Sequence, residues 1–157
     1  MEIRSAVTDD AEAACSVLRR SITQLCVADH RNDPAILARW LANKTPTHVR
    51  DWIASDQQSV LVAVEDGTVL GVGSVTTAGR IDLNYVAPEA RFRGASKAML
   101  AALEARAHRF GAAECVLEST ATARRFYLSA GYAEAAAPVR MFGTASYPMA
   151  KQLAPGQ

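Results

Sequence analysis

The order of apolar patterns along the chain predicts an α/β (α+β) domain in which helices flank a mixed, mostly antiparallel central sheet. Three observations lead to this fold class. Helical periodicities follow a short first strand, an Asp-Gly turn joins two β-rich runs, and strand and helix patterns alternate after that turn. We expect one domain over residues 1–153, since 157 residues match the size of one ordinary domain, and a short tail over residues 154–157.

The first third of the chain is predicted to hold one strand and three helices. Residues 2–7 form the strand, and a helix follows it directly. Asp33 and Thr45 each stand before a proline, and a capping side chain followed by proline is a typical helix start. Two further short helices are therefore expected. The residues expected to face inward are Ala14, Val17, Leu18, Ile22, Leu25, Ile36, Leu37, Trp40, Leu41, Val49, Trp52 and Ile53.

The middle of the chain has the pattern of a β-hairpin. Residues 59–65 and 69–75 are rich in β-branched residues, and Asp66-Gly67 between them is typical of a two-residue hairpin turn. A third strand is expected over residues 81–87, where a proline follows.

Helices and strands alternate in the last third of the chain. We expect a long helix over residues 94–110, a strand over residues 113–118 and a helix over residues 120–130. Residues 132–153 would make two final strands with an irregular connection. The apolar stripe expected on the long helix comprises Met99, Leu103, Ala107 and Phe110.

The charge balance excludes several classes of partner. The chain carries 17 basic and 16 acidic residues, a formal net charge of +1, without the basic surplus of a nucleic-acid-binding protein or a polybasic stretch for an anionic membrane. Its first residues lack the apolar segment of a signal peptide, and no apolar run is long enough to span a bilayer. We therefore expect a cytoplasmic protein that binds neither nucleic acid nor membrane.

The cysteines and histidines do not predict a metal site. The number of cysteines is odd, none belongs to a CxxC pair, and no histidine shares a metal-ligand spacing with them. Reduced, partly buried thiols are expected instead. The residues concerned are Cys15, Cys26, Cys115, His30, His48 and His108.

Small residues and positive charges meet at the expected start of the long helix. The first turn of a helix has backbone N–H groups without an intrahelical acceptor and a partial positive charge, which together favour a phosphate or pyrophosphate. The alternative is an ordinary helix start with solvated arginines. Neither GxxxxGK[ST] nor GxGxxG is present, so the segment is not a P-loop or a dinucleotide fingerprint. Its residues are Arg91, Arg93, Gly94, Ala95, Ser96 and Lys97.

Two signature motifs and the strand before the first of them resemble those of a known family. Arg91-x-x-Gly94-x-Ser96 is similar to the [Q/R]-x-x-G-x-[G/A] signature of the GNAT superfamily of acyl-CoA-dependent N-acetyltransferases. The strand sequence IDLNYVAP at 81–88 resembles the family's fourth strand, and ARRFYLSAGY at 123–132 resembles its second signature, A-x-x-F-Y-x-x-x-G-[F/Y]. The resemblance covers nearly the whole chain, with serine at 96 where glycine or alanine is usual.

The resemblance implies an N-acetyltransferase that moves an acetyl group from acetyl-CoA to a small-molecule or peptide amine by direct attack in a ternary complex. It implies that the pyrophosphate binds the loop from Arg93 to Lys97, and it is compatible with a homodimer. Thr120 replaces the asparagine that often holds the pantetheine arm, so a weaker bond is expected there. The implied cofactor-binding residues are Tyr85, Val86, Ala87, Arg91, Arg93, Gly94, Ala95, Ser96, Lys97 and Thr120.

The resemblance also implies a proton donor for the leaving thiolate. Tyr127 matches the tyrosine that in many relatives donates to the CoA sulfur. The alternative is a core aromatic residue beside Phe126 on an amphipathic helix.

The general base is less defined. Many relatives use an acid on the fourth strand, acting through water, and Asp82 lies on that strand, where a period of two would place it with Arg80 and Asn84 on one face. The alternative is a solvated or salt-bridged carboxylate. Glu118 is a second candidate, and water without a dedicated base is a third explanation.

The acceptor is not identified by the sequence. His30 lies in the segment where acceptors often bind, although a lone histidine in a loop is commonly just exposed, and the two tryptophans are also expected in the core. A CoA-binding sensor without catalysis and an interaction protein on the same fold are the two rival functions. The candidates for the acceptor pocket are Asp29, His30, Asp33, Trp40 and Trp52.

Overall fold

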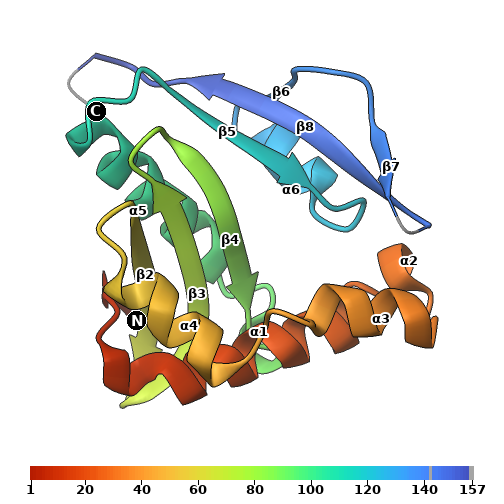
Figure 1. Cartoon of the computed structure of the whole chain (residues 1–157). Helices are drawn as coiled ribbons and strands as arrows, with labels where there is room; N and C mark the ends of the chain where they lie inside the picture. The colour runs from red at the N-terminus through yellow and green to blue at the C-terminus, as the bar shows by residue number, and fades with distance from the viewer. Residues whose placement is uncertain (142, 156–157) are drawn as a thin grey trace.

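A single mixed sheet connects all eight strands of the computed structural model, which describes residues 1–141 and 143–155 (Figure 1). The strand order is β1-β2-β3-β4-β5-β8-β6, and β7 pairs with β8. All pairs are antiparallel except β4 and β5, which confirms the predicted fold class. The strands are β1 (Glu2–Ser5), β2 (Gln58–Glu65), β3 (Thr68–Thr76), β4 (Arg80–Val86), β5 (Glu114–Ser119), β6 (Ala133–Glu134), β7 (Val139–Met141) and β8 (Thr144–Gln152).

Six α-helices accompany these strands in the described chain. Their bounds are α1 (Ala11–Leu25), α2 (Val27–His30), α3 (Pro34–Leu41), α4 (Pro46–Ala54), α5 (Ala95–Arg109) and α6 (Arg124–Ser129). Short 3₁₀ turns cover Thr8–Asp10 and Pro88–Ala90. No helix in this part of the chain is both long and apolar enough to cross a membrane.

The predicted helix starts and hairpin turn are present. The Asp33 carboxylate accepts a hydrogen bond from Ala35 N at 2.9 Å, and Thr45 Oγ1 accepts one from His48 N at 3.1 Å. Asp66 and Gly67 have φ values of 51° and 75°, as a two-residue type I′ turn requires. Local side-chain and backbone chemistry therefore determines these features.

Two apolar clusters cover the two faces of the sheet. The first packs α1 and α4 against β2, β3 and β4, and the second packs α5 against the opposite face. Gly73 lets α5 approach closely, because a Cβ atom there would lie 2.7 Å from Met99 Sδ and 2.9 Å from Leu103 Cδ1. This close packing holds β3 firmly against α5.

A β-bulge interrupts the expected alternation along β4. Ser74 pairs with Leu83 and Val75 pairs with Ile81, so Asp82 is the extra residue. Consequently Ile81 packs in the α5 cluster while Leu83 packs in the α1 cluster. The prediction of a regular period of two through Asp82 was wrong at this point.

Other expectations needed correction. The helix expected over residues 120–130 begins only at Arg124, a separate helix α2 precedes α3, and three strands rather than two end the chain. Phe110 is 39% exposed, because α5 ends at the preceding residue and the stripe stops with it. Of the expected tail, residues 156–157 lie outside the described residues.

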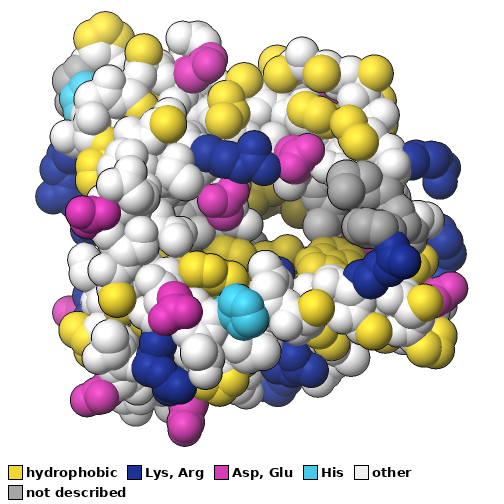
Figure 2. All heavy atoms as spheres, viewed as in Figure 1, with side chains coloured by type: hydrophobic (Ala, Val, Ile, Leu, Met, Phe, Trp, Pro, Cys, Tyr) yellow, Lys and Arg dark blue, Asp and Glu magenta, His cyan; other side chains and the backbone are white. Residues whose placement is uncertain are grey.

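The two halves of the sheet separate at the β4–β5 pair. These strands pair only through Arg80–Val116 and Ile81–Leu117, after which they diverge (Figure 1). The strands β1–β4 lie with α1–α4 on one side of the divergence, and β5–β8 lie with α6 on the other. Figure 2 shows the surface hollowed between the halves, with acidic and basic side chains on the rim.

Candidate active site

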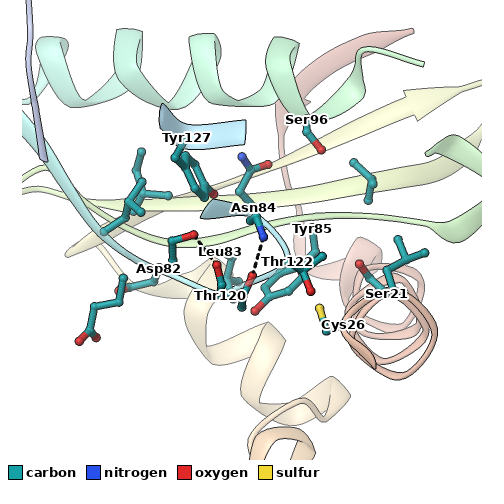
Figure 3. Close-up of a pocket in the computed structure, with 17 residues that line it drawn as sticks. Ser21, Cys26, Asp82, Leu83, Asn84, Tyr85, Ser96, Thr120, Thr122 and Tyr127 are labelled. Atoms are coloured by element: carbon teal, nitrogen blue, oxygen red, sulfur yellow. Dashed lines mark hydrogen bonds between the residues drawn. The ribbon is translucent and has the colours of Figure 1, made fainter. Parts of the chain in front are cut away.

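Two cavities adjoin where β4 and β5 diverge. We name the first the β4–β5 cavity (Figure 3) and the second, which is lined by α3 and the start of β8, the α3 cavity. Tyr85, Glu118, Ser119 and Thr120 line both, so one cavity leads into the other at these residues. Further lining residues are Asp82, Asn84, Val86, Ser96, Thr122 and Tyr127 in the β4–β5 cavity, and Asp29, Arg39, Trp40, Asn43, Lys44 and Ser146 in the α3 cavity.

The start of α5 has the geometry of an anion-binding helix terminus. Gly94 is the N-cap residue with φ 80°, and no side chain caps the helix. The N–H groups of the first turn therefore have no intrahelical acceptor, and the helix dipole places partial positive charge there. Ser96, in this first turn, lines the β4–β5 cavity.

The cations around this helix start are not equivalent. Arg93 donates to both oxygens of Glu65, at 2.6 and 2.8 Å, and this bond lowers the pKa of the Glu65 carboxyl. The Arg91 guanidinium lies 4.6 Å from the ring centre of Phe92, and Lys97 is exposed. Arg93 thus already has a protein carboxylate as its partner, whereas the sequence suggested a phosphate.

The edge of β4 that faces away from β3 is open beyond the bulge. Ala87 N donates to Leu70 O of β3 at 2.8 Å. Because successive N–H groups of a strand alternate between its two edges, the N–H of Val86 points toward the side from which β5 has diverged. Val86 also lines the β4–β5 cavity, which places this donor where a bound carbonyl could reach it.

Tyr127 is both a core residue and a residue of the cavity wall. Its side chain is buried, with ring centres of Phe126 and Tyr132 at 5.1 and 5.6 Å. Burial raises the pKa of Tyr127 to about 12, and the Asn84 amide acts in the opposite direction. The hydroxyl therefore keeps its proton at neutral pH, and the residue packs among aromatic rings while it also lines the β4–β5 cavity.

Asn84 is a site residue that the sequence analysis did not single out. Figure 3 shows it directed toward Tyr127 and Ser96. Both polar atoms of its amide are buried and make no hydrogen bond of good geometry among the described residues, although the amide lies close enough to the Tyr127 hydroxyl to act on its pKa. The available signal was an amide side chain on β4 directly before Tyr85 and Val86, and a buried amide needs a ligand, water or protein group to bond it.

The two candidate bases share one arginine. Arg80 donates to Asp82 at 2.7 Å and to Glu118 at 2.9 Å, and all three side chains are 40–50% exposed. The bond to Asp82 is the main cause of the raised pKa of Arg80. Both acids lie beside the divergence of β4 and β5, but only Glu118 lines both cavities.

The α3 cavity contains two of the five predicted acceptor-pocket residues, Asp29 and Trp40. Asp33 instead caps α3, and Trp52 packs against the α1 cluster. The alternative of an exposed His30 was wrong, because its side chain is buried and bonds Ile22 O through Nε2 at 2.8 Å.

His30 is held in one tautomer by its partners. Its Nδ1 accepts from Asn32 N at 3.0 Å, so Nε2 carries the proton that is donated to Ile22 O. Within residues 1–141 and 143–155, no group of three or more His, Cys, Asp or Glu side chains could hold a metal ion.

Lys44 is a second site residue that the sequence did not indicate. The residue is 8% exposed, and its Nζ donates to Asn43 Oδ1 at 2.7 Å and to Trp40 O at 3.4 Å. Burial lowers its pKa. In the described chain no carboxylate lies within ion-pair distance of Lys44, so the α3 cavity has a buried cation in its wall.

Comparisons with solved structures agree with this fold. A structure of PaiA N-acetyltransferase from Thermoplasma acidophilum in complex with coenzyme A is 20% identical, with a TM-score of 0.81 over 97% of this chain and 98% of that one. A GCN5-related N-acetyltransferase from Rhodopseudomonas palustris is 24% identical, with a TM-score of 0.85 over 97% and 95% of the two chains. YncA from Salmonella typhimurium, a putative acetyltransferase solved with acetyl-CoA, is 24% identical, with a TM-score of 0.69 over 100% and 96%.

These similarities establish the fold, and a match of a different kind establishes the family. None of the curated proteins compared with the chain matches it. The model of the acetyltransferase (GNAT) domain matches residues 21–153, which include both signatures and both cavities. Because that match spans most of the sequence, the chain belongs to the GNAT family of acetyltransferases.

Proposed function

We propose that this acetyltransferase moves the acetyl group of acetyl-CoA to the amine of a small molecule or peptide, by direct attack in a ternary complex. The observation that carries the proposal is the divergence of β4 and β5, which lets two cavities adjoin beside an uncapped helix start. Structures of PaiA with coenzyme A and YncA with acetyl-CoA support the choice of acyl donor.

The β4–β5 side fits the chemistry of acetyl-CoA. The first turn of α5, from Gly94 through Lys97, would bind the pyrophosphate through its N–H groups, with Arg91 adding charge. The open edge of Tyr85, Val86 and Ala87 would pair with the amides of the pantetheine arm, as an added strand does. Thr120 would contribute a hydroxyl from the loop that follows β5, where it lines both cavities.

The proposed reaction has three steps that this chain assists. A neutral amine entering from the α3 cavity attacks the thioester carbon, and the Val86 N–H stabilises the negative charge that develops on the carbonyl oxygen. The carbon–sulfur bond then breaks, and the departing thiolate takes the proton of the Tyr127 hydroxyl. The proton lost by the amine leaves through water toward Asp82 or Glu118, and solvent restores the proton of Tyr127.

Of the two acids, Glu118 is better placed to meet the acceptor, because it lines both cavities. Asp82 lies on the bulge and lines only the β4–β5 cavity. Because Arg80 bonds both carboxylates, the proposed proton path includes both of them.

We also propose a cytoplasmic location and a homodimer. Three buried, unbridged cysteines fit a reducing compartment. The homodimer rests on the family resemblance. Light scattering at micromolar concentration should give twice the mass of the chain, and a monomer there would contradict it.

The function is tested by binding first and turnover second. Calorimetry should show that CoA binds, and CoA should raise the melting temperature because it binds the native state. A panel of amines incubated with acetyl-CoA should then release free thiol with at least one acceptor. Binding without any turnover would favour the sensor, and no binding would favour the interaction protein.

A further inference from the structure

A buried carboxylate in α2 holds the loop that follows β5. Asp29 is 4% exposed, and it accepts hydrogen bonds from Ala121 N at 2.6 Å, Thr122 N at 3.2 Å and Thr122 Oγ1 at 2.5 Å. The donors lie 92 and 93 positions later in the chain. One side chain thus binds two consecutive backbone N–H groups and a hydroxyl across the site.

The loop itself supplies a side-chain acceptor for one of its N–H groups, and Asp29 supplies the acceptor for two others. The N-cap residue of α6 is Ala123, which has no side chain to accept from the first turn. Thr120 Oγ1 accepts from Ala123 N at 3.0 Å, which leaves the N–H groups of Ala121 and Thr122 to the Asp29 carboxylate. An ionised acceptor makes these bonds stronger than those to a neutral group.

The same loop carries groups of the proposed site. Thr120 lines both cavities, and Tyr127 N donates to Ala123 O at 3.1 Å, so the loop sets where α6 begins. Asp29 itself lines the α3 cavity. The end of α2 is tied to the far half of the sheet at a second point, where Arg31 Nη2 donates to Gly143 O at 3.1 Å.

We propose that Asp29 is a positioning residue, which fixes the loop from Thr120 to Ala123 for the pantetheine arm and for Tyr127, and thereby couples the wall of the α3 cavity to the acyl-donor side. The inference rests on the proposed function, since it assumes that CoA occupies the β4–β5 cavity. It adds a role for a residue that acts through its hydrogen bonds to Ala121 and Thr122.

The test compares two buried carboxylates. Glu104 is also 4% exposed, and it accepts from Tyr132 Oη at 2.8 Å and Lys151 Nζ at 3.1 Å, but it lines neither cavity. Both Asp29→Asn and Glu104→Gln are expected to lower the melting temperature. Only Asp29→Asn should weaken CoA binding in calorimetry, by about tenfold, the equivalent of one charge-assisted hydrogen bond.

A second pair of variants keeps the test decisive if Asp29→Asn does not fold. Thr122→Val removes the hydroxyl bond and leaves the two backbone bonds, so CoA affinity should fall about threefold, while Thr122→Ser should restore it. Hydrogen exchange of residues 120–127 should accelerate in Asp29→Asn or Thr122→Val and stay unchanged in Glu104→Gln.

The outcomes separate the two proposals. If the parent protein binds no CoA, the proposed function is wrong and the role of Asp29 is wrong with it. If the parent binds CoA but Asp29→Asn binds it as tightly as Glu104→Gln does, Asp29 only stabilises the fold. Equal CoA affinity of Thr122→Val and Thr122→Ser would likewise overturn the positioning role.

Discussion

The start of α5 and the α2–α3 segment border the same site but are built in different ways. At α5, neighbouring small residues and the left-handed Gly94 create the binding geometry locally. At α2–α3, Asp29 and Arg31 instead bond Ala121 and Gly143, which lie far along the chain. The comparison teaches that the start of α5 depends on local backbone geometry, whereas the α2–α3 segment depends on contacts that the tertiary fold makes.

The largest effect is expected at the start of α5, where the backbone geometry is set locally. Gly94→Val should weaken CoA binding by more than about 100-fold, because a β-branched residue disfavours the left-handed conformation and crowds an anion at the helix start. Calorimetry with CoA measures this change.

Gly67→Val provides the matched control. Gly67 and Gly94 have φ values of 75° and 80°, and a Cβ atom at either would meet nothing within 4 Å. Both variants should lose similar stability, so equal loss of CoA affinity would show that backbone strain, and not the helix start, is responsible.

The next effect concerns Tyr127. Tyr127→Phe should lower kcat by about 100-fold, because it removes the proton donor but keeps the packing. With its pKa raised to about 12, the hydroxyl stays protonated below that pH, so the parent's turnover should show no loss from Tyr127 ionisation up to about pH 10. Stopped-flow detection of the released thiol measures the kcat of the variant and the pH dependence of the parent's turnover.

Tyr132→Phe is the control for a buried tyrosine outside the cavities. It loses the bond to Glu104 and should lower stability by about 1 kcal/mol without changing kcat. Unchanged turnover in Tyr127→Phe, with chemistry as the slow step, would return Tyr127 to a purely structural role.

A smaller effect is expected from the paired acids. Glu118→Gln should lower kcat about tenfold and Asp82→Asn less, because either carboxylate can accept the proton through water. Stability should hardly change, since these ion pairs are exposed. The control is Glu89→Gln, which loses an exposed ion pair with Arg20 outside both cavities and should leave kcat unchanged. If Asp82→Asn lowered kcat more than Glu118→Gln, Asp82 would be the main proton acceptor.

The smallest effect is expected on stability, from a change of Lys44 in the wall of the α3 cavity. Burial lowers the pKa of Lys44 in the folded protein. Between that pKa and the ordinary lysine value, the unfolded chain binds more protons than the folded one. The contribution of Lys44 to the free energy of unfolding therefore rises with pH in this window. Lys44→Met should be more stable than the parent by about 1 kcal/mol at pH 7, and the difference should shrink toward pH 10.

Denaturant titrations at both pH values check this prediction. CoA affinity should not change in Lys44→Met, because the side chain lines only the α3 cavity. A constant stability difference across the range would mean that Lys44 keeps its charge with its present partners.

Patterns that depend on neighbouring residues were predictable from the sequence. The caps at Asp33 and Thr45, the Asp66-Gly67 turn, the fold class and the α5 signature all follow from local backbone preferences. The family was predictable for the same reason, since both signatures are contiguous stretches, and the match over residues 21–153 confirms it.

Other features were decided only by the tertiary structure. The bulge at Asp82 depends on the pairing of β4 with β3, and the loop before α6 bonds Asp29, which lies 92 and 93 positions earlier in the chain. The pairing of Arg93 with Glu65, and of Asp82 and Glu118 with one arginine, likewise joins separate segments. Such contacts leave no periodic signal, because the energy of a hydrogen bond or ion pair depends on distance in space and not on separation along the chain.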